Sequence, residues 1–288
     1  MEHPTHSWTT PVRWAWTHKR RVACVISGFV IVVYACIYAV VASGVSPADQ
    51  FSRLPNGDTL AYTTSTGSDG SGAVVLVHGC PADASCWTKL IQGHRASLPS
   101  NVVAVDRLGY GNSSSGVRSS LVEQAAALVP FLEPTDGRKP ILVGHSYGGP
   151  VVLRAAVDQS DRIGGIVLVA GACDAYMQDA QWLRRAVEWI SPIVPEPWEV
   201  ANAELLALTD ENRVMEPLLD RVTCPVVIVH GTWDPVCPHD ATVAYLQERL
   251  VNAQEVRVVS LPRAGHNLHL GYAEVLAEQI RTLTALEH

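Results

Sequence analysis

Apolar residues after position 50 fall into two kinds of segment. Short continuous runs, rich in Val and Ile, alternate with longer stretches in which apolar residues recur every three or four positions. Continuous runs are typical of strands buried on both faces of a parallel sheet, and the longer spacing is typical of helices. Strands that alternate with helices are joined by crossovers, so the pattern predicts an α/β fold with a mostly parallel sheet flanked by helices. The runs expected to be strands are 73–78, 102–105, 141–143, 166–170, 226–230 and 256–259.

Local signals add detail on either side of the first two runs. Gly57-Asp58 is a turn signal between two strand-like segments, 51–54 and 59–64, and predicts an opening β-hairpin. The stretch Ser120–Glu123 has the spacing of a capping box, which predicts a helix that starts there and continues through Leu132.

The regular alternation breaks at about residues 174–221. Apolar residues recur there at helical spacing, but three prolines interrupt the pattern. This predicts a lid of two or three short helices inserted between strands. Trp182, Trp189 and Trp198 would line a ligand pocket, whereas the alternative is that the apolar faces of these helices only cap the core.

Before position 50, residues 22–42 form a long apolar segment of 21 residues without a charge. At ~1.5 Å per helical residue it is long enough for the ~30 Å core of a bilayer, so it predicts a single transmembrane anchor. The basic tail 1–21 should stay in the cytoplasm, which places the body 51–288, after the linker 43–50, outside the cytoplasm. The alternative interpretation is a cleaved signal peptide, which would leave a secreted protein.

Composition and charge narrow the possible partners. The chain has 288 residues, 48% of them hydrophobic and 17% charged, enough for one large α/β domain with a small appendage. Of the net charge of −7, residues 1–21 contribute +3, so the rest of the chain carries −10. An acidic body without a basic stripe argues against nucleic acid as a partner. Oligomeric state is left open.

The seven cysteines suggest buried thiols. Cys80 and Cys86 are close enough in sequence to pair, but small buried thiols are the better interpretation and no bridge is expected. None of the cysteines or histidines shows metal-ligand spacing, so we expect no metal and no cofactor.

The sequence Gly144-His145-Ser146-Tyr147-Gly148 joins a strand-like run to a helical pattern. A serine at the tip of such a turn has a strained backbone and an exposed hydroxyl, which suits a nucleophile. Glycines two residues to either side are needed because a Cβ there would collide with the neighbouring strand or helix. The pattern therefore nominates Ser146.

Three motifs, each at a predicted strand end, carry a family resemblance: His78-Gly79-Cys80-Pro81, Asp106–Ser113 and Gly144–Gly149. From about Phe51 to Leu286 the chain resembles the serine hydrolases of the α/β-hydrolase superfamily. The resemblance implies a Ser-His-acid triad in the chain order serine, acid, histidine. It also implies an oxyanion hole after the early His-Gly strand and, usually, a helical lid.

The acid and the histidine should lie on loops beyond strand ends, so that both side chains reach the serine. Asp234 follows the run 226–230 and is the preferred acid, while Asp174, after the preceding strand, is the alternative. His266 follows the last run and is the expected base. His269, three residues later, is expected beside the site or on the surface.

Main-chain N–H groups are expected to form the oxyanion hole. Tyr147 stands at the start of the elbow helix, and Cys80 is the natural donor on its loop because Pro81 has no N–H. Three further histidines, His78, His145 and His230, are expected to support the core or the site by hydrogen bonds. For the loop after the strand 102–105 we favour a structural turn over a pocket wall.

Together these features predict a serine hydrolase that cleaves a small or medium acyl ester through an acyl-enzyme. Acyltransferase, lactonase, thioesterase and cofactor-free haloperoxidase activities use the same triad and stay open. A serine nucleophile disfavours dehalogenase and epoxide hydrolase chemistry, which uses an aspartate at this position in related folds. A ligand-binding or signalling module that retains the triad is the alternative from another class.

Overall fold

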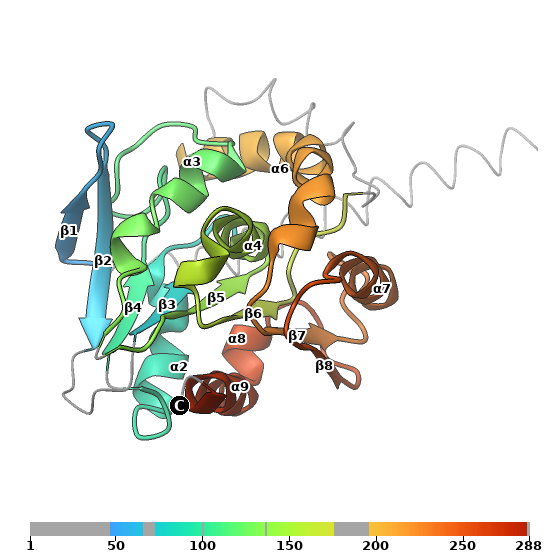
Figure 1. The fold of residues 1–288 in the computed structure, drawn as a ribbon. Helices are drawn as coiled ribbons and strands as arrows, with labels where there is room; N and C mark the ends of the chain where they lie inside the picture. Colours follow the sequence, from blue (N-terminus) through green and yellow to red (C-terminus); the bar gives the residue numbers. More distant parts are fainter. Residues whose placement is uncertain (1–46, 66–72, 100, 136, 176–195, 287–288) are drawn as a thin grey trace, which may run out of the picture. The chain divides into compact units, whose positions relative to one another are not determined.

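An eight-stranded sheet forms the centre of the fold (Figure 1). The computed structural model describes residues 47–65, 73–99, 101–135, 137–175 and 196–286. The sheet order is β1-β2-β4-β3-β5-β6-β7-β8; β2 pairs antiparallel with β1 and β4, and all other pairs are parallel. The predicted mostly parallel α/β sheet is therefore confirmed. The strands are β1 (Gln50–Arg53), β2 (Thr59–Ser65), β3 (Ala73–Val77), β4 (Asn101–Val105), β5 (Ile141–His145), β6 (Gly165–Val169), β7 (Val226–Gly231) and β8 (Val256–Leu261).

Helices cover both faces of the sheet because alternate strand residues point to opposite faces. Leu142 of β5 packs into one core, and its neighbours Ile141 and Val143 pack into the other. The first core includes residues of α3 (Leu121–Ala126), α4 (Gly148–Gln159), α6 (Glu196–Met215), η5 (Glu216–Arg221) and α7 (His239–Arg249). The second includes residues of η1 (Ala84–Trp87), α2 (Thr88–Gly93), α8 (Leu268–Gly271) and α9 (Ala273–Leu286). The 3₁₀ turns η2 (Val129–Phe131) and η3 (Ser160–Arg162) complete the described elements.

The predicted hairpin is confirmed. Arg53 of β1 pairs with Thr59 of β2, and Gly57 occupies the turn between them with φ of +91°. A backbone angle in this region favours glycine, which explains why the turn signal was reliable.

The predicted capping box is wrong. Within the described residues the side chain of Ser120 makes no capping hydrogen bond, and the N–H of Leu121 donates to Glu211 Oε2 of α6 at 2.8 Å. The helix also ends at Ala126, before the expected end, and a 3₁₀ turn follows. Pro130 in that turn has no N–H to continue an α-helix. The start of the helix is therefore held by a tertiary contact, and the predicted local cap does not form.

The segment between β6 and β7 differs from the expected set of short helices. Its described part is one helix of 20 residues, α6, followed directly by η5. Pro197 does not interrupt α6 because it lies in the first turn, where its missing N–H is not needed. Residues 176–195, with Trp182 and Trp189, lie outside the described residues.

The predicted anchor, residues 22–42, also lies outside the described residues, as do its basic tail and the first part of the linker. Among the helices that the structure describes, none has both the length and the apolar character needed to cross a bilayer. The anchor therefore stays a prediction.

Asp106, at the end of β4, holds the following loop together. Its buried carboxylate accepts hydrogen bonds from the N–H groups of Ala84 and Asn112, each at 2.8 Å. The side chain thus joins the turn after β4 to the start of η1. This is the structural role that the sequence favoured for the loop.

Replacing Asp106 by alanine should therefore destabilise the protein. The buried N–H of Ala84 and the partly buried N–H of Asn112 would lose their acceptor, which should lower the free energy of unfolding by about 1–3 kcal/mol. Urea titration followed by circular dichroism measures this change. Asp161→Ala, at an exposed position, is the matched control and should stay within ~0.5 kcal/mol of the wild type. Equal stabilities of the two variants would contradict the proposed role of Asp106.

Candidate active site

The turn between β5 and α4 is as sharp as the sequence predicts. Ser146 has φ of +52°, a region that residues with a side chain rarely occupy and that marks local strain. A Cβ on Gly148 would collide with the carbonyl of Val77 in β3, and one on Gly144 would collide with the backbone of Gly148. The two glycines let strand and helix approach closely enough to hold the serine at the tip.

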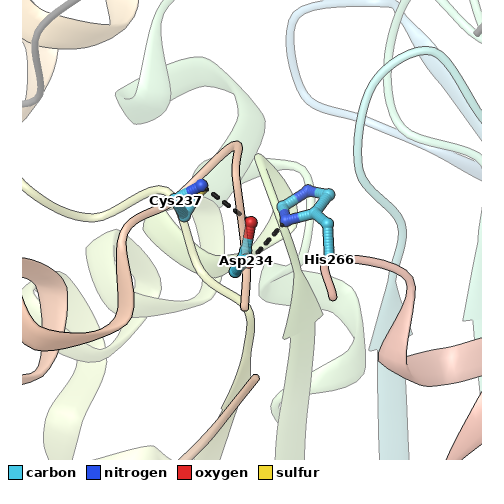
Figure 2. A group of neighbouring side chains, drawn as sticks. All are labelled: Asp234, Cys237 and His266. Atoms are coloured by element: carbon cyan, nitrogen blue, oxygen red, sulfur yellow. Dashed lines mark hydrogen bonds and ion pairs between the residues drawn. The ribbon is translucent and has the colours of Figure 1, made fainter. Parts of the chain in front are cut away.

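The structure brings Ser146, His266 and Asp234 together. His266 Nε2 lies 2.9 Å from Ser146 Oγ, and His266 Nδ1 lies 2.8 Å from Asp234 Oδ2. Asp234 follows β7 and His266 follows β8, so the two adjacent strands deliver these side chains to the same place (Figure 2). Because Nδ1 donates to the carboxylate, Nε2 is free to accept the serine proton. The arrangement is a continuous hydrogen-bonded chain from acid to nucleophile.

The Asp234 carboxylate is held by its own loop. Oδ1 accepts the N–H groups of Val236 at 2.8 Å and Cys237 at 2.9 Å, the second of which Figure 2 shows. Burial alone would raise the pKa of Asp234, but the hydrogen bonds from His230, His266 and Cys237 hold it well below its usual range. Asp234 is therefore ionised throughout the neutral range and favours a protonated Nδ1 on His266.

Asp174, the alternative acid, lies after a different strand from Asp234. It follows β6 and is buried, and its backbone carbonyl lies 3.4 Å from Nδ2 of Asn212 in α6. The carboxylate hydrogen-bonded to His266 is that of Asp234. The geometry thus favours Asp234, as the sequence did.

Two further histidines support the His266 loop. His145 Nε2 lies 3.2 Å from the carbonyl oxygen of His266, and the His145 and His269 rings are 4.1 Å apart at their centroids. Burial lowers the pKa of His145, and it lowers the pKa of His269 to about 4, so both are neutral at pH 7. His145 can then donate its Nε2–H to the carbonyl and tie the elbow to the His266 loop.

His230 supports the acid in a similar way. Its Nε2 lies 2.8 Å from the Cys237 carbonyl and 3.4 Å from Asp234 Oδ2. The ring is fully buried in β7. The expectation that His145 and His230 are hydrogen-bonded supporting residues is confirmed, and His269 lies beside the site and is buried.

The two expected oxyanion segments meet at the nucleophile. A Cβ on Gly79 would lie 2.8 Å from Cβ of Ser146, so the loop that carries Cys80 runs directly beside the elbow. Tyr147 is the N-cap of α4, where main-chain N–H groups have no acceptor within the helix. Both segments therefore border the space next to Ser146 Oγ.

A buried ion pair beside these segments was missed from the sequence. Arg107 and Glu204 form a salt bridge while only 1% and 0% of their side chains, respectively, are exposed. Arg107 stands in a loop that was expected to be only a structural turn. Glu204 stands in a helical pattern in which only apolar residues were expected inside, so no local signal identified it.

One group of side chains has the donor types of a metal site. Ligand atoms of Asp234, Cys237 and His266 lie within 4.8 Å of one another, and all three residues are buried. A divalent cation between them would have to displace the hydrogen bond between Asp234 and His266. We therefore assign the carboxylate and the imidazole to each other. The five cysteines in the described part of the chain, including Cys80 and Cys86, carry free thiols.

The chain is similar to known proteins in sequence and in fold. The family profile described as "Alpha/beta hydrolase family" matches residues 74–279. The chain is 24% identical over 265 residues to the dihydrolipoyllysine-residue acetyltransferase component of the acetoin cleaving system of Pseudomonas putida, which covers 81% of this chain and 68% of that protein. It is 27% identical over 197 residues to the serine hydrolase BPHL of Homo sapiens, which covers 60% of this chain and 65% of that protein.

A solved structure gives the same fold. An esterase from Thermogutta terrifontis superposes with a TM-score of 0.64 at 22% identity, covering 83% of this chain and 99% of that one. The chain spans about two thirds of the length of the two relatives named above.

Asp234→Asn should lower kcat by about 10⁴-fold, because an amide that donates a hydrogen bond favours the wrong imidazole tautomer. Asp174→Asn is the matched control and should change kcat only a few-fold. Initial rates with a p-nitrophenyl ester measure both. If Asp234→Asn left kcat unchanged while Asp174→Asn lowered it by orders of magnitude, the acid would be misassigned.

The effect of Asp234→Asn on the free energy of unfolding should also depend on pH. The depressed pKa of Asp234 means that its carboxylate stabilises the folded state above about pH 4 and that this contribution is lost as the pH falls further. The stability difference between wild type and Asp234→Asn should therefore be largest near neutral pH and shrink below pH ~4.

Proposed function

We propose that this chain, which belongs to the alpha/beta hydrolase family, is a serine hydrolase that cleaves an acyl ester through an acyl-enzyme intermediate. The observation that carries the proposal is the unbroken hydrogen-bonded chain from Asp234 through His266 to Ser146. The strained backbone at Ser146 supports it, because a binding module has no need of a nucleophile held in this conformation.

The reaction follows from the positions of these atoms. Ser146 Oγ attacks the acyl carbonyl while His266 Nε2 takes the hydroxyl proton, and the imidazolium then protonates the leaving alkoxide. Water repeats the sequence on the acyl-enzyme, with His266 again as base, and the acid product leaves. Asp234 keeps the imidazole in the required tautomer and stabilises its positive charge.

The oxyanion that forms in each step would be held by the main-chain N–H groups of Cys80 and Tyr147. Donors aimed at the developing charge are worth about 10²–10³-fold in kcat each. Because the donor at residue 80 is main chain, the thiol is not required, and Cys80→Ser should keep most of the activity.

We propose a small or medium acyl ester as the substrate. An acyl acceptor other than water is the second candidate, since the name of the Pseudomonas putida relative refers to an acetyltransferase component. Adding an alcohol or thiol and following the partition between transfer and hydrolysis products separates the two. Lactones and thioesters fit the same chemistry and belong in the same substrate panel.

Ser146→Ala and His266→Ala should each lower kcat by about 10⁶-fold, and the double variant should be little worse, because members of a triad act as a unit. Turnover of a p-nitrophenyl ester gives the rates. A fluorophosphonate should label wild-type Ser146 rapidly and should not label Ser146→Ala. Full turnover by Ser146→Ala would overturn the hydrolase proposal, and a wild type that neither turns over nor is labelled would favour the binding module.

We also propose that the protein is anchored in a membrane by residues 22–42, with the body outside the cytoplasm. The length of the uncharged segment and the basic residues before it support this topology. A secreted form after signal cleavage is the alternative.

Carbonate-washed membranes from cells that make the full chain should retain the protein, and protease added to spheroplasts should remove the body. An arginine pair introduced in the middle of the segment 22–42 should release the protein from the membrane, because charges at the bilayer centre are costly. Full-length wild-type protein in the soluble fraction would contradict the anchor. A mature amino terminus near Ser43 would favour the secreted form.

A further inference from the structure

The buried pair of Arg107 and Glu204 has a complete set of hydrogen bonds. The Glu204 carboxylate accepts from both terminal nitrogens of Arg107, from the hydroxyl of Tyr110 at 2.6 Å and from Gln124 Nε2 at 3.3 Å. Two charges with no access to water are retained only if their partners compensate for the lost hydration. These donors fix the carboxylate, and through it the guanidinium, in one position.

Arg107 uses its remaining donors on the loop that carries Cys80. Its Nε donates to the carbonyl of His78 at 3.0 Å, and its Nη2 donates to the carbonyl of Gly79 at 3.2 Å. Its backbone N–H donates to His78 Nε2 at 2.9 Å, which leaves the proton on Nδ1 to donate to the Gly79 carbonyl at 2.6 Å. The Gly79 carbonyl is thus held by two donors.

The Gly79 carbonyl matters because it shares a peptide unit with the N–H of Cys80. This unit is planar and trans, so its carbonyl and N–H point in opposite directions. Holding the Gly79 oxygen against Arg107 therefore sets the direction of the Cys80 N–H.

The same guanidinium also contacts the second donor segment. The Arg107 side chain lies over the ring of Tyr147, 4.7 Å from its centroid, and the Tyr147 hydroxyl lies 3.2 Å from the carbonyl of Ser119. One side chain thus contacts both segments whose N–H groups would bind the oxyanion.

We infer that Glu204 of α6 and Arg107 are positioning residues that together set the orientation of both oxyanion donors. Neither residue touches the substrate in this inference, which rests on the proposed hydrolase function. Loss of the pair should weaken binding of the transition state and leave binding of the substrate unchanged, so kcat falls and KM does not.

The test compares three changes in the full chain: Arg107→Lys, Glu204→Gln and the double variant Arg107→Met with Glu204→Leu. Glu204→Gln leaves the buried guanidinium without its charged partner and can prevent folding, whereas the double variant removes both charges and keeps apolar volume. The matched control is Arg249→Lys with Glu216→Gln, which alters a partly exposed Arg–Glu pair between α7 and η5. Thermal melts establish that each variant is folded at the assay temperature.

Two readouts separate positioning from general damage: the kinetics of a p-nitrophenyl ester and the affinity for a trifluoromethyl ketone, which forms a tetrahedral adduct with the serine. We expect kcat to fall at least tenfold, with KM within about twofold, since a misplacement of 1 Å can cost ~10²-fold in rate. Affinity for the ketone should fall by a similar factor. The control should keep its kcat, KM and ketone affinity.

A folded double variant with wild-type kcat would overturn the inference. A rise in KM at unchanged kcat would also overturn it, because that result would show that the pair contributes to substrate binding and not to stabilisation of the transition state. Failure of the proposed function is recognised separately: the wild type itself would then neither turn over the ester nor be labelled at Ser146 by a fluorophosphonate.

Discussion

The close approach of α4 to the ends of β3 and β5 is the constraint on which the site depends. Residue 148 has no room for a side chain because the carbonyl of Val77 occupies that space. This packing forces Ser146 into a positive φ and places the loop after β3 beside it, where Gly79 leaves just enough space for the serine Cβ. Nucleophile and oxyanion loop are therefore positioned by one contact between backbone segments, before any catalytic side chain is considered.

Two buried carboxylates near the site, Asp234 and Glu204, have different roles. Asp234 lies among N–H donors and imidazoles, which keep it charged and direct that charge at His266. Glu204 forms an ion pair with the guanidinium of Arg107 and holds that side chain in position. Buried ion pairs are poor sources of net stability because desolvation offsets their attraction. Retention of such a pair at this place is better explained by the orientation it imposes on neighbouring backbone groups than by added stability.

Features of the fold and the site that depend on local sequence patterns could be predicted, whereas those that depend on contacts between residues far apart in sequence could not. Ser146 and the mostly parallel sheet could be predicted because glycine spacing and continuous apolar runs are local consequences of dense packing. Asp234 and His266 could be placed because parallel strands end at the same edge of the sheet. The capping box at Ser120 was mispredicted because the local pattern does not reveal that Glu211, 90 positions beyond Leu121, accepts the N–H of Leu121 at the start of the helix. Glu204 could not be found because nothing beside it in sequence shows that Arg107 lies within reach.

The acidic face of α6 explains how this helix is joined to the core. Glu196, Glu204 and Glu211 are spaced by eight and seven residues, about two helical turns each, so they share one face. They accept hydrogen bonds from the Gly116 N–H at 3.2 Å, from Arg107 and from the Leu121 N–H at 2.8 Å. All three donors belong to the segment 107–121, which is the loop after β4 and the first residue of α3, so α6 is bound along its length to this segment. Because that segment begins with Arg107, which donates to the carbonyls of His78 and Gly79, a displacement of α6 would act directly on the backbone beside Ser146.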